Sequence, residues 1–284
     1  MDIQLEYYME PKGRLARFAV LGAGFTFNVA AEMNNEINLG IMDTQDRDDQ
    51  FIGVEYKRYL TPIESSKSPY LIRPYIQRAN DVSVRYFQAD NDSRYQVGAN
   101  WYVNPSWVVS GDYTFVNREN DRSFYSDNHY QALDLNLGYF FQPNWHAGVG
   151  VYYTRRTWES AFGDITESYR DSDWSPSVFS RYTSLDGGSG WDVRGEYTFS
   201  DTQNFELDGR YFFNQKLSLS ATYTYIEQDE RFAPVDDIIA GQHLLELGFD
   251  YWFSSHFNFR FGLGTDLEQG DGISSLTLLT SIRF

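Results

Sequence analysis

The end of the chain constrains the fold more than any other segment. Its last twelve residues, ISSLTLLTSIRF, alternate between apolar and polar side chains up to a terminal aromatic residue. The ends of soluble chains usually fray, whereas a transmembrane β-barrel needs a final strand that pairs with the first one and removes both edges of the sheet. This segment alone leaves two folds open, a barrel and a soluble β-sandwich. The alternating positions are apolar Leu276, Leu278, Ile282 and Phe284, and polar Ser275, Thr277, Ser281 and Arg283.

Aromatic residues make up 18% of the chain, with 22 Tyr, 22 Phe and 7 Trp. A membrane barrel uses aromatic side chains in two interfacial girdles. The mean hydropathy is polar, at -0.52, and no run approaches the ~20 apolar residues of a transmembrane helix. A barrel is consistent with this polarity, because only alternate residues of its strands face lipid.

Charge and cysteine content narrow the choice further. The net charge of -17 argues against a nucleic-acid partner, since such binders are usually basic. The chain has no cysteine, which excludes disulfides and thiolate metal sites. The first residues, MDIQLEYYM, alternate like a strand and do not resemble a signal peptide. Either an initiator Met replaces the leader of an exported protein in its mature form, or the protein is not exported, and we expect the first.

Four short connections share a pattern in which aromatic or apolar residues precede a three-residue polar turn and a large apolar residue follows it. They lie at Asn104, Gln142, Asn214 and Ser254, spaced 38, 72 and 40 residues apart. Because the spacing of 72 residues is about twice the other two, a further turn is expected near residue 180, and the Gly-rich stretch Leu185–Gly190 lies close to that position. The period therefore corresponds to one hairpin with a short and a longer connection.

The connections between these hairpins are longer and mostly acidic: DTQDRDD, VNRENDRSFYSDN, WESAFGDITESYRDSD, EQDERFAPVDD and DLEQGDG. Outer-membrane barrels have short periplasmic turns and longer extracellular loops. The sequence therefore predicts an all-β, antiparallel transmembrane barrel that occupies residues 1–284 as one domain.

The alternating segments number about 16, an even count as bacterial barrels require. The expected strands begin near residues 2, 15, 34, 50, 81, 93, 106, 128, 145, 174, 190, 203, 216, 242, 256 and 273. We expect Ile273–Phe284 to pair with Ile3–Tyr8 and to end at the periplasmic girdle. The segment Thr61–Asp81 carries three prolines, which disfavour a central strand. We expect it to be a periplasmic connection at the barrel mouth.

The stretch EYKRYLTPIESSKSPYLIRPYIQRANDVSVRYF resembles the putative general bacterial porin family of Gram-negative bacteria, as do the aromatic hairpins and the terminal Phe. The resemblance implies a 16-stranded outer-membrane barrel that the barrel assembly machinery recognises through the C-terminal strand, with Phe284 as the assembly signal. The best-studied porins carry a long loop folded into the lumen. This chain departs from that pattern, because no loop is clearly long enough, and the nearest candidate is Thr157–Asp173.

Alternation assigns fourteen charged residues to the lumen, because each would cost a few kcal/mol if it faced lipid at the bilayer midplane. A barrel of this width leaves an aqueous channel, so the charged lining predicts a diffusion pore. Some of these side chains also fit cross-strand ion pairs that hold register, in particular Arg194, Glu206, Asp208 and Arg210. The residues are Arg94, Asp112, Asp134, Arg156, Arg181, Asp192, Arg194, Glu196, Glu206, Asp208, Arg210, Glu246, Asp250 and Arg260.

The expected function is passive diffusion of small hydrophilic solutes with a modest cation preference, which negative charge near the mouth would favour. Two alternatives stay open. One is a channel selective for an anionic or sugar solute, and the other is a plugged structural or adhesive barrel. The basic track for an anion would be Arg94, Arg156, Arg181, Arg194, Arg210 and Arg260.

The expected partners are outer-membrane lipid and lipopolysaccharide, with homo-oligomerisation left open. The acidic loops carry oxygen ligands of the kind that Ca²⁺ prefers but lack EF-hand spacing, so we expect solvated loops and no metal site. No cofactor is expected. The chain lacks a nucleophile motif such as GxSxG, so we do not expect an enzyme. We expect the four histidines, His129, His146, His243 and His256, to be girdle residues.

Overall fold

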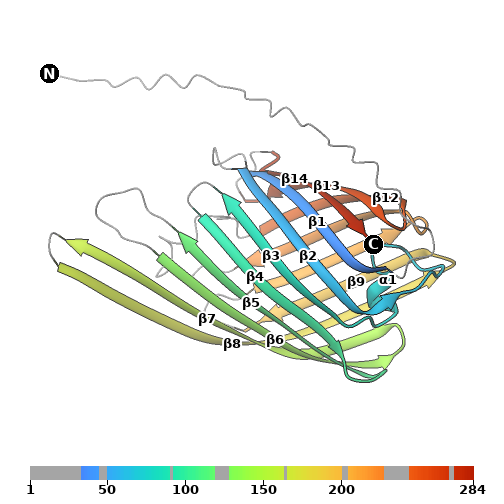
Figure 1. The fold of residues 1–284 in the computed structure, drawn as a ribbon, viewed down its shortest axis with the longest axis horizontal. Helices are drawn as coiled ribbons and strands as arrows, with labels where there is room; N and C mark the ends of the chain where they lie inside the picture. The colour runs from blue at the N-terminus through green and yellow to red at the C-terminus, as the bar shows by residue number, and fades with distance from the viewer. Residues whose placement is uncertain are drawn as a thin grey trace, which may run out of the picture. The chain divides into compact units, whose positions relative to one another are not determined.

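The structure is a computed structural model that describes residues 33–44, 50–89, 92–118, 128–162, 165–199, 204–226, 243–268 and 272–284. These residues form fourteen antiparallel strands and one short helix, α1 (Arg73–Ile76). Each strand pairs with its neighbours in sequence and β14 pairs with β1, which closes the sheet into a barrel (Figure 1). The strands are β1 Met33–Thr44, β2 Gln50–Ile63, β3 Asp81–Ala89, β4 Asp92–Tyr102, β5 Trp107–Arg118, β6 Asn128–Gln142, β7 Trp145–Phe162, β8 Ile165–Asp186, β9 Ser189–Thr198, β10 Asn204–Phe212, β11 Leu217–Ile226, β12 His243–Ser254, β13 Phe257–Asp266 and β14 Ser275–Arg283.

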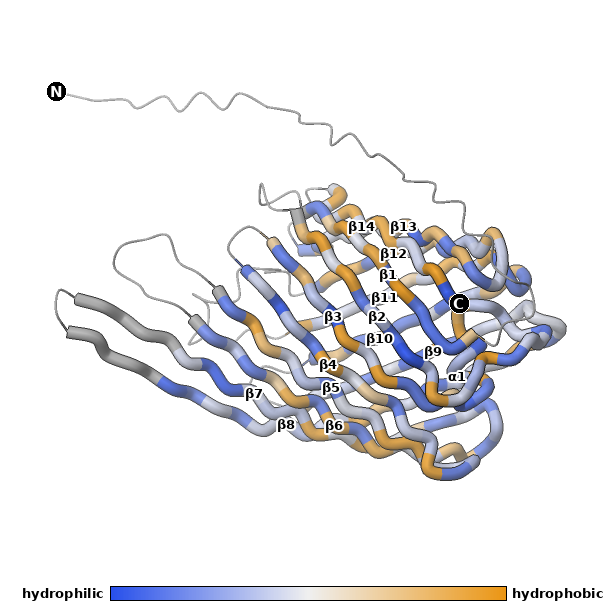
Figure 2. The backbone as a smooth tube through the Cα atoms, in the orientation of Figure 1, coloured by the Kyte–Doolittle hydropathy of each residue, from blue (hydrophilic) through white to orange (hydrophobic). Residues whose placement is uncertain are grey.

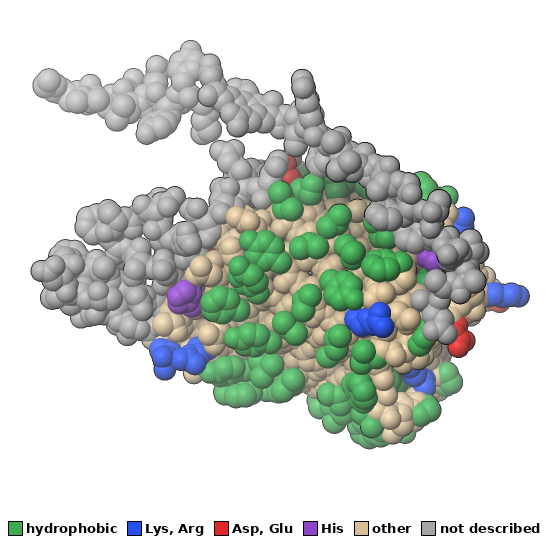
Figure 3. Space-filling view, in the orientation of Figure 1, with side chains coloured by type: hydrophobic (Ala, Val, Ile, Leu, Met, Phe, Trp, Pro, Cys, Tyr) green, Lys and Arg blue, Asp and Glu red, His purple; other side chains and the backbone are tan. Residues whose placement is uncertain are grey.

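The outer face of the barrel is apolar. Hydrophobic and hydrophilic residues alternate along most strands (Figure 2), and hydrophobic side chains cover much of the outer face seen in Figure 3. Aliphatic side chains such as Val97 and Val149 are more than half exposed, at 54% and 56%. Such exposure is costly in water but suits contact with lipid. Among the described residues, no helix is long and apolar enough to cross a membrane.

Aromatic side chains gather on the outer face towards both ends of the strands. Trp101, Phe141 and Phe253 are exposed at the end with the short turns. Tyr95 and Trp174 are exposed towards the opposite end. Two such girdles mark the two membrane interfaces of an outer-membrane barrel.

The two ends of the barrel have different connections. At one end β6–β7, β8–β9 and β12–β13 are joined by two residues each, and β4–β5 and β10–β11 by four. The β8–β9 turn places Gly187 and Gly188 at φ +58° and +95°, which is the left-handed backbone that a two-residue hairpin turn requires. The opposite end is called the long-loop end: there β5–β6 and β11–β12 are joined by nine and sixteen residues, although β3–β4 and β7–β8 are joined by two. In outer-membrane barrels the short turns face the periplasm.

The expected closed all-β barrel is confirmed, but the count of sixteen strands is wrong. The strand that closes the barrel onto β14 is β1, with Glu36 opposite Arg283 and Thr44 opposite Ser275. Because β13 occupies the other edge of β14, the expected pairing of Ile273–Phe284 with Ile3–Tyr8 is also wrong. The strands expected near residues 2 and 15 lie outside the described residues.

The hairpin of β7 and β8 includes the nearest candidate for a lumen loop. Thr157–Asp173 is not a loop folded into the lumen, because its backbone continues the ladder of these two strands up to the pair Phe162 and Ile165. These strands have 18 and 22 residues, about twice the ~9–11 that span a bilayer. The hairpin extends beyond the ends of neighbouring strands (Figure 1).

Residues 64–80, here called the mouth segment, connect β2 to β3 at the short-turn end and include α1. The expected non-strand connection was Thr61–Asp81, but Thr61–Ile63 continue β2 and Asp81 begins β3. The helix has Pro74 in its first turn, where a missing backbone N–H costs nothing. A buried apolar cluster of Met33, Tyr59, Ile63 and Ala79 joins this segment to β1 and β2.

Candidate functional site: the barrel lumen

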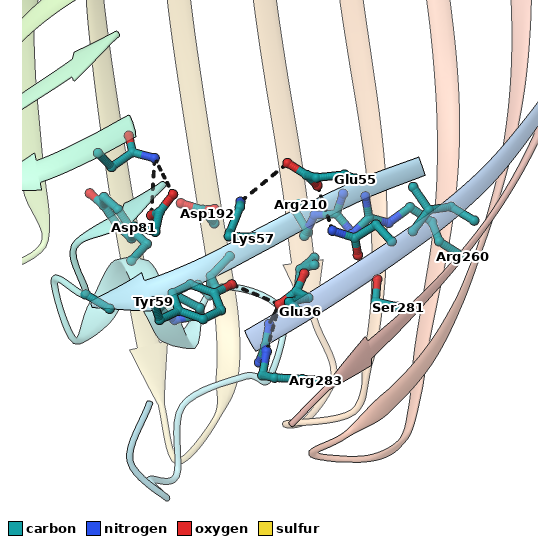
Figure 4. A pocket seen from close by; sticks show the side chains of 18 of the residues that line it. Glu36, Glu55, Lys57, Tyr59, Asp81, Asp192, Arg210, Arg260, Ser281 and Arg283 are labelled. Atoms are coloured by element: carbon teal, nitrogen blue, oxygen red, sulfur yellow. Dashed lines mark hydrogen bonds and ion pairs between the residues drawn. The ribbon is translucent and has the colours of Figure 1, made fainter. Parts of the chain in front are cut away.

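The barrel encloses a cavity of about 560 Å³ at the level of the mouth segment (Figure 4). Its walls come from β1 to β4, β8 to β10, β13 and β14, and the mouth segment contributes Leu71, Ile72, Pro74, Tyr75 and Ala79. The site is therefore a polar chamber. Part of its floor is the mouth segment, which connects β2 to β3.

Strand register places all fourteen expected lumen residues on one face of the sheet. Side chains opposite each other in an antiparallel pair share a face, and the pairs Arg181 with Arg194 and Asp250 with Arg260 illustrate this. Six of the fourteen line the cavity itself: Arg181, Asp192, Arg194, Asp208, Arg210 and Arg260. Asp250 lies buried beneath Arg260, and the other seven lie on the same face closer to the long-loop end.

Other cavity residues were missed by the sequence reasoning. Glu55 and Lys57 face inward on β2, and the alternation of EYKR with Val54 and Tyr56 could have identified them. The alternation in β1 and β14 could also have predicted that Glu36 and Arg283 face inward. The residues of the mouth segment gave no such signal, because that segment has no strand period.

Ion pairs cross-link neighbouring strands at the cavity wall. Arg181 binds Asp192 through two hydrogen bonds of 2.7 and 2.9 Å, and Thr183 donates to the same carboxylate. Arg260 donates to Asp250 at 3.1 Å. Charge-assisted, bidentate pairs of this kind fix side-chain geometry as well as register.

The residues for which we expected cross-strand pairs are arranged differently. Arg194 bonds Glu196 at 2.6 Å, two residues along its own strand. Arg210 donates to the hydroxyl of Ser218, and Asp208 accepts from Thr222. Arg194 and Arg210 therefore retain donors directed at the cavity that they line.

The seam between the first and last strands contains a buried charge cluster. Arg283 of β14 donates to Oε2 of Glu36 on β1 through Nε at 2.8 Å, and its Nη2 lies 2.6 Å from the same oxygen. Tyr59 adds a third bond at 2.8 Å (Figure 4). Arg283 is 2% exposed and Glu36 is 8% exposed. Because both charges are buried, each depends on the other.

Charge is distributed unevenly around the cavity. Arg181, Arg194, Arg210 and Arg260 come from β8, β9, β10 and β13, whereas Glu36, Glu55 and Asp81 come from β1, β2 and β3. The lining carries six cationic side chains, with Lys57 and Arg283, and five acidic ones, with Asp192 and Asp208. Opposed charges of this kind set a field across a pore.

The mouth segment is anchored on several sides. Gln215, in the β10–β11 turn, accepts from the backbone N–H of Tyr70 at 2.9 Å, and Arg283 donates to the Tyr70 carbonyl at 3.0 Å. Arg78 donates to the carbonyl of Pro105 in the β4–β5 turn. Since the segment starts at β2 and reaches turns across the barrel, it crosses the short-turn mouth.

A buried arginine and contacts between guanidinium groups and aromatic rings stabilise the mouth segment. Arg73 is 2% exposed and donates to the carbonyls of Ser66 and Ser68 at 2.8 and 3.0 Å, and its guanidinium lies 4.4 Å from the ring of Tyr70. The Arg181 guanidinium lies 3.6 Å from the ring centre of Tyr75. Burial raises the pKa of Tyr75 above its usual range, although nearby Arg181 opposes this shift. The phenol is therefore neutral at physiological pH.

The expectation for the histidines is wrong in one case. His146 does not lie in the outer girdle but lines a second, smaller cavity inside the barrel, stacked on Phe140 with ring centres 4.6 Å apart. His243 accords with a girdle position, beside Tyr223 and Tyr225. Among the described residues, no group of three or more His, Cys, Asp and Glu side chains is placed to hold a metal ion. The acidic loops DTQDRDD and EQDERFAPVDD lie mostly outside the described part of the chain.

Comparison with solved structures supports the barrel fold. The chain is similar to the outer-membrane protein Omp33 of Acinetobacter baumannii, with a TM-score of 0.65 and 15% identity, over 89% of this chain and 99% of that one. BamA from Haemophilus ducreyi matches with a TM-score of 0.45 and 9% identity, over 89% of this chain and 70% of the other. No curated protein sequence matches the chain.

The family model for putative general bacterial porins matches residues 17–172, more than half of the chain. The matched region includes the first part of the barrel, from β1 into β8, and the whole mouth segment. The fold and the sequence thus agree on a channel-forming barrel of the bacterial outer membrane. The chain belongs to the putative general bacterial porin family.

Proposed function

We propose that the protein is a porin through which small hydrophilic solutes diffuse passively, and that it has no enzymatic activity. The observation that carries this proposal is the charged cavity of about 560 Å³ inside a closed, lipid-facing barrel. A lumen of this width holds water rather than a packed core. Liposome-swelling rates for sugars of increasing size, measured on refolded protein, test it. Vesicles that do not swell with any sugar, together with a bilayer that shows no conductance steps, would refute it.

We expect a modest cation preference. Towards the long-loop end, the same face of the barrel carries five expected acidic lumen residues, Asp112, Asp134, Glu196, Glu206 and Glu246, against the two arginines Arg94 and Arg156. An excess of one charge at a pore entrance concentrates ions of the opposite sign. The reversal potential across a planar bilayer with a KCl gradient measures the preference, and a potential of the anion-selective sign would contradict it.

A second candidate is a channel for a small anionic solute. Four of the six arginines of the expected basic track, Arg181, Arg194, Arg210 and Arg260, line one cavity. Arginine binds carboxylates in planar, paired geometry. Addition of a small dicarboxylate should then block the current in the wild type and block it less in Arg210→Gln. A current that is indifferent to the dicarboxylate favours simple diffusion.

A further inference from the structure

One side of the mouth segment is bound to the barrel wall. The backbone of Tyr70 is bonded at both its N–H and its carbonyl, to Gln215 and Arg283. The ring of Tyr70 packs edge-on against Trp252, with ring centres 5.9 Å apart, and Trp252 is 1% exposed. Hydrogen bonds and ring packing therefore hold this side of the segment against the β10–β11 turn, β12 and β14.

The other side of the segment is open to a second cavity of about 120 Å³. The small cavity shares five lining residues with the larger chamber: Tyr75, Asn100, Tyr102, Arg181 and Arg194. It extends past Ser110 to Val108, Gly138 and His146, close to the short turns of β4–β5 and β6–β7. The small cavity thus adjoins the chamber and follows the inner wall from β4 to β9, where β5, β6 and β7 line the small cavity but not the chamber.

Polar and aromatic side chains line the small cavity, among them Ser110, Asn136, His146 and Phe179. In the described chain both ring nitrogens of His146 are buried without a hydrogen-bond partner, and the ring is enclosed by Phe140 and Phe179, with ring centres 4.6 and 5.1 Å away. Gly138 makes room for the His146 ring, because a Cβ at that position would collide with Nε2 of His146.

Tyr75 stands between the chamber and the small cavity. Its ring lies against Arg181 on one side, and its centre is 6.0 Å from Phe140 and 6.2 Å from His146. The ring is carried by α1, which the anchors described above hold in the mouth. Of the residues that line both cavities, Tyr75 is the one that the mouth segment carries, and the others lie on strands of the barrel wall.

We propose that solutes pass the mouth segment on the Tyr75 side, through the small cavity, and that Tyr75 sets the size limit for permeation. This inference rests on the proposed porin function. In this arrangement Tyr75 selects solutes by size, and the Tyr70 side of the segment is a fixed anchor.

Replacement of Tyr75 tests the size limit. Conduction is governed by the narrowest section of a pore, so we expect Tyr75→Ala to raise the single-channel conductance about twofold or more and to admit larger sugars. Tyr75→Phe keeps the ring and should conduct like the wild type. A Tyr75→Ala protein with wild-type conductance and the same sugar cut-off would show that the constriction lies elsewhere.

Cysteine labelling tests the path itself. The chain contains no cysteine, so Ser110→Cys introduces a single thiol, at a residue that lines the small cavity and not the chamber. A small methanethiosulfonate reagent should label it and reduce the conductance by about half or more, as obstruction of the narrowest part of a pore does. Val109→Cys, on the outer face at 42% exposure, is the control and should show unchanged conductance.

Two results overturn the path. One is a fully labelled Ser110→Cys channel with unchanged conductance, with labelling established by mass spectrometry. The other is a conducting Ser110→Cys channel that the reagent does not label. A wild-type protein without conductance steps refutes the porin function instead, and the inference with it. The labelling results therefore separate failure of the path from failure of the function.

Discussion

Replacing residues 61–79 by an Asn-Gly turn should raise the single-channel conductance by roughly threefold or more, because a barrel of fourteen strands without a floor leaves an open aqueous channel. Leu60 and Asn80 already hydrogen-bond through their backbones at 2.7 Å, so a two-residue turn can join β2 to β3 directly. We also expect sugars excluded by the wild type to cause swelling. The effect should exceed that of Tyr75→Ala, which removes one side chain from the same mouth.

The variant needs a folding control, since it removes Ile63 and Ala79 from the buried cluster that also contains Met33 and Tyr59. Heat-modifiable migration in gel electrophoresis reports whether the barrel still closes. A closed variant with wild-type conductance would mean that the mouth segment does not limit flow. The variant also tests the plugged-barrel alternative: if the wild type is silent and the variant conducts, the segment is a complete plug.

Arg283→Met should destabilise the barrel by about 3–5 kcal/mol, the usual effect of removing one partner from a buried ion pair. The substitution leaves the Glu36 carboxylate buried at the seam, with Tyr59 as its remaining neighbour in the cluster. The free energy of unfolding, measured by urea titration of the refolded barrel in detergent, gives the effect. The double variant Arg283→Met with Glu36→Leu replaces both charges and should recover most of the loss.

The double variant separates the pair from simple packing. If the single and double variants are equally unstable, the loss comes from the packing of Arg283 against Trp252, whose ring lies 4.6 Å from the guanidinium. If Arg283→Met is as stable as the wild type, the Glu36 carboxylate is hydrated in its absence. Either result contradicts the assigned role of the seam ion pair.

Alternation in the sequence identified the strands well because it reports a local property. Expected starts near residues 34, 50, 128 and 145 correspond to β1, β2, β6 and β7, which begin at residues 33, 50, 128 and 145. The same pattern cannot tell which strand meets β14. That choice depends on how many strands close the circle, which is a property of the whole sheet, and so the pairing with Ile3–Tyr8 was wrong.

The same limit applies to the lumen residues. The sequence pattern predicts the face of the sheet on which a side chain lies, but not the side chains that it contacts. Period two placed Arg194 and Glu206 on the inner face, and the register places them there. It did not reveal that Arg194 would bond Glu196 along its own strand, because this depends on side-chain rotamers and neighbours. The prolines of the mouth segment indicated a break in the sheet. Its contacts to Gln215 and Pro105 lie far away in sequence and carry no local signature.

Arg283 has a double role in the barrel. Its guanidinium closes the seam with β1 through Glu36 and also holds the mouth segment through the Tyr70 carbonyl. One side chain thus belongs both to the closure of the sheet and to the floor of its lumen. Loss of Arg283 should therefore weaken the seam between β1 and β14 and loosen the mouth segment together, so that barrel stability and solute selection depend on the same residue.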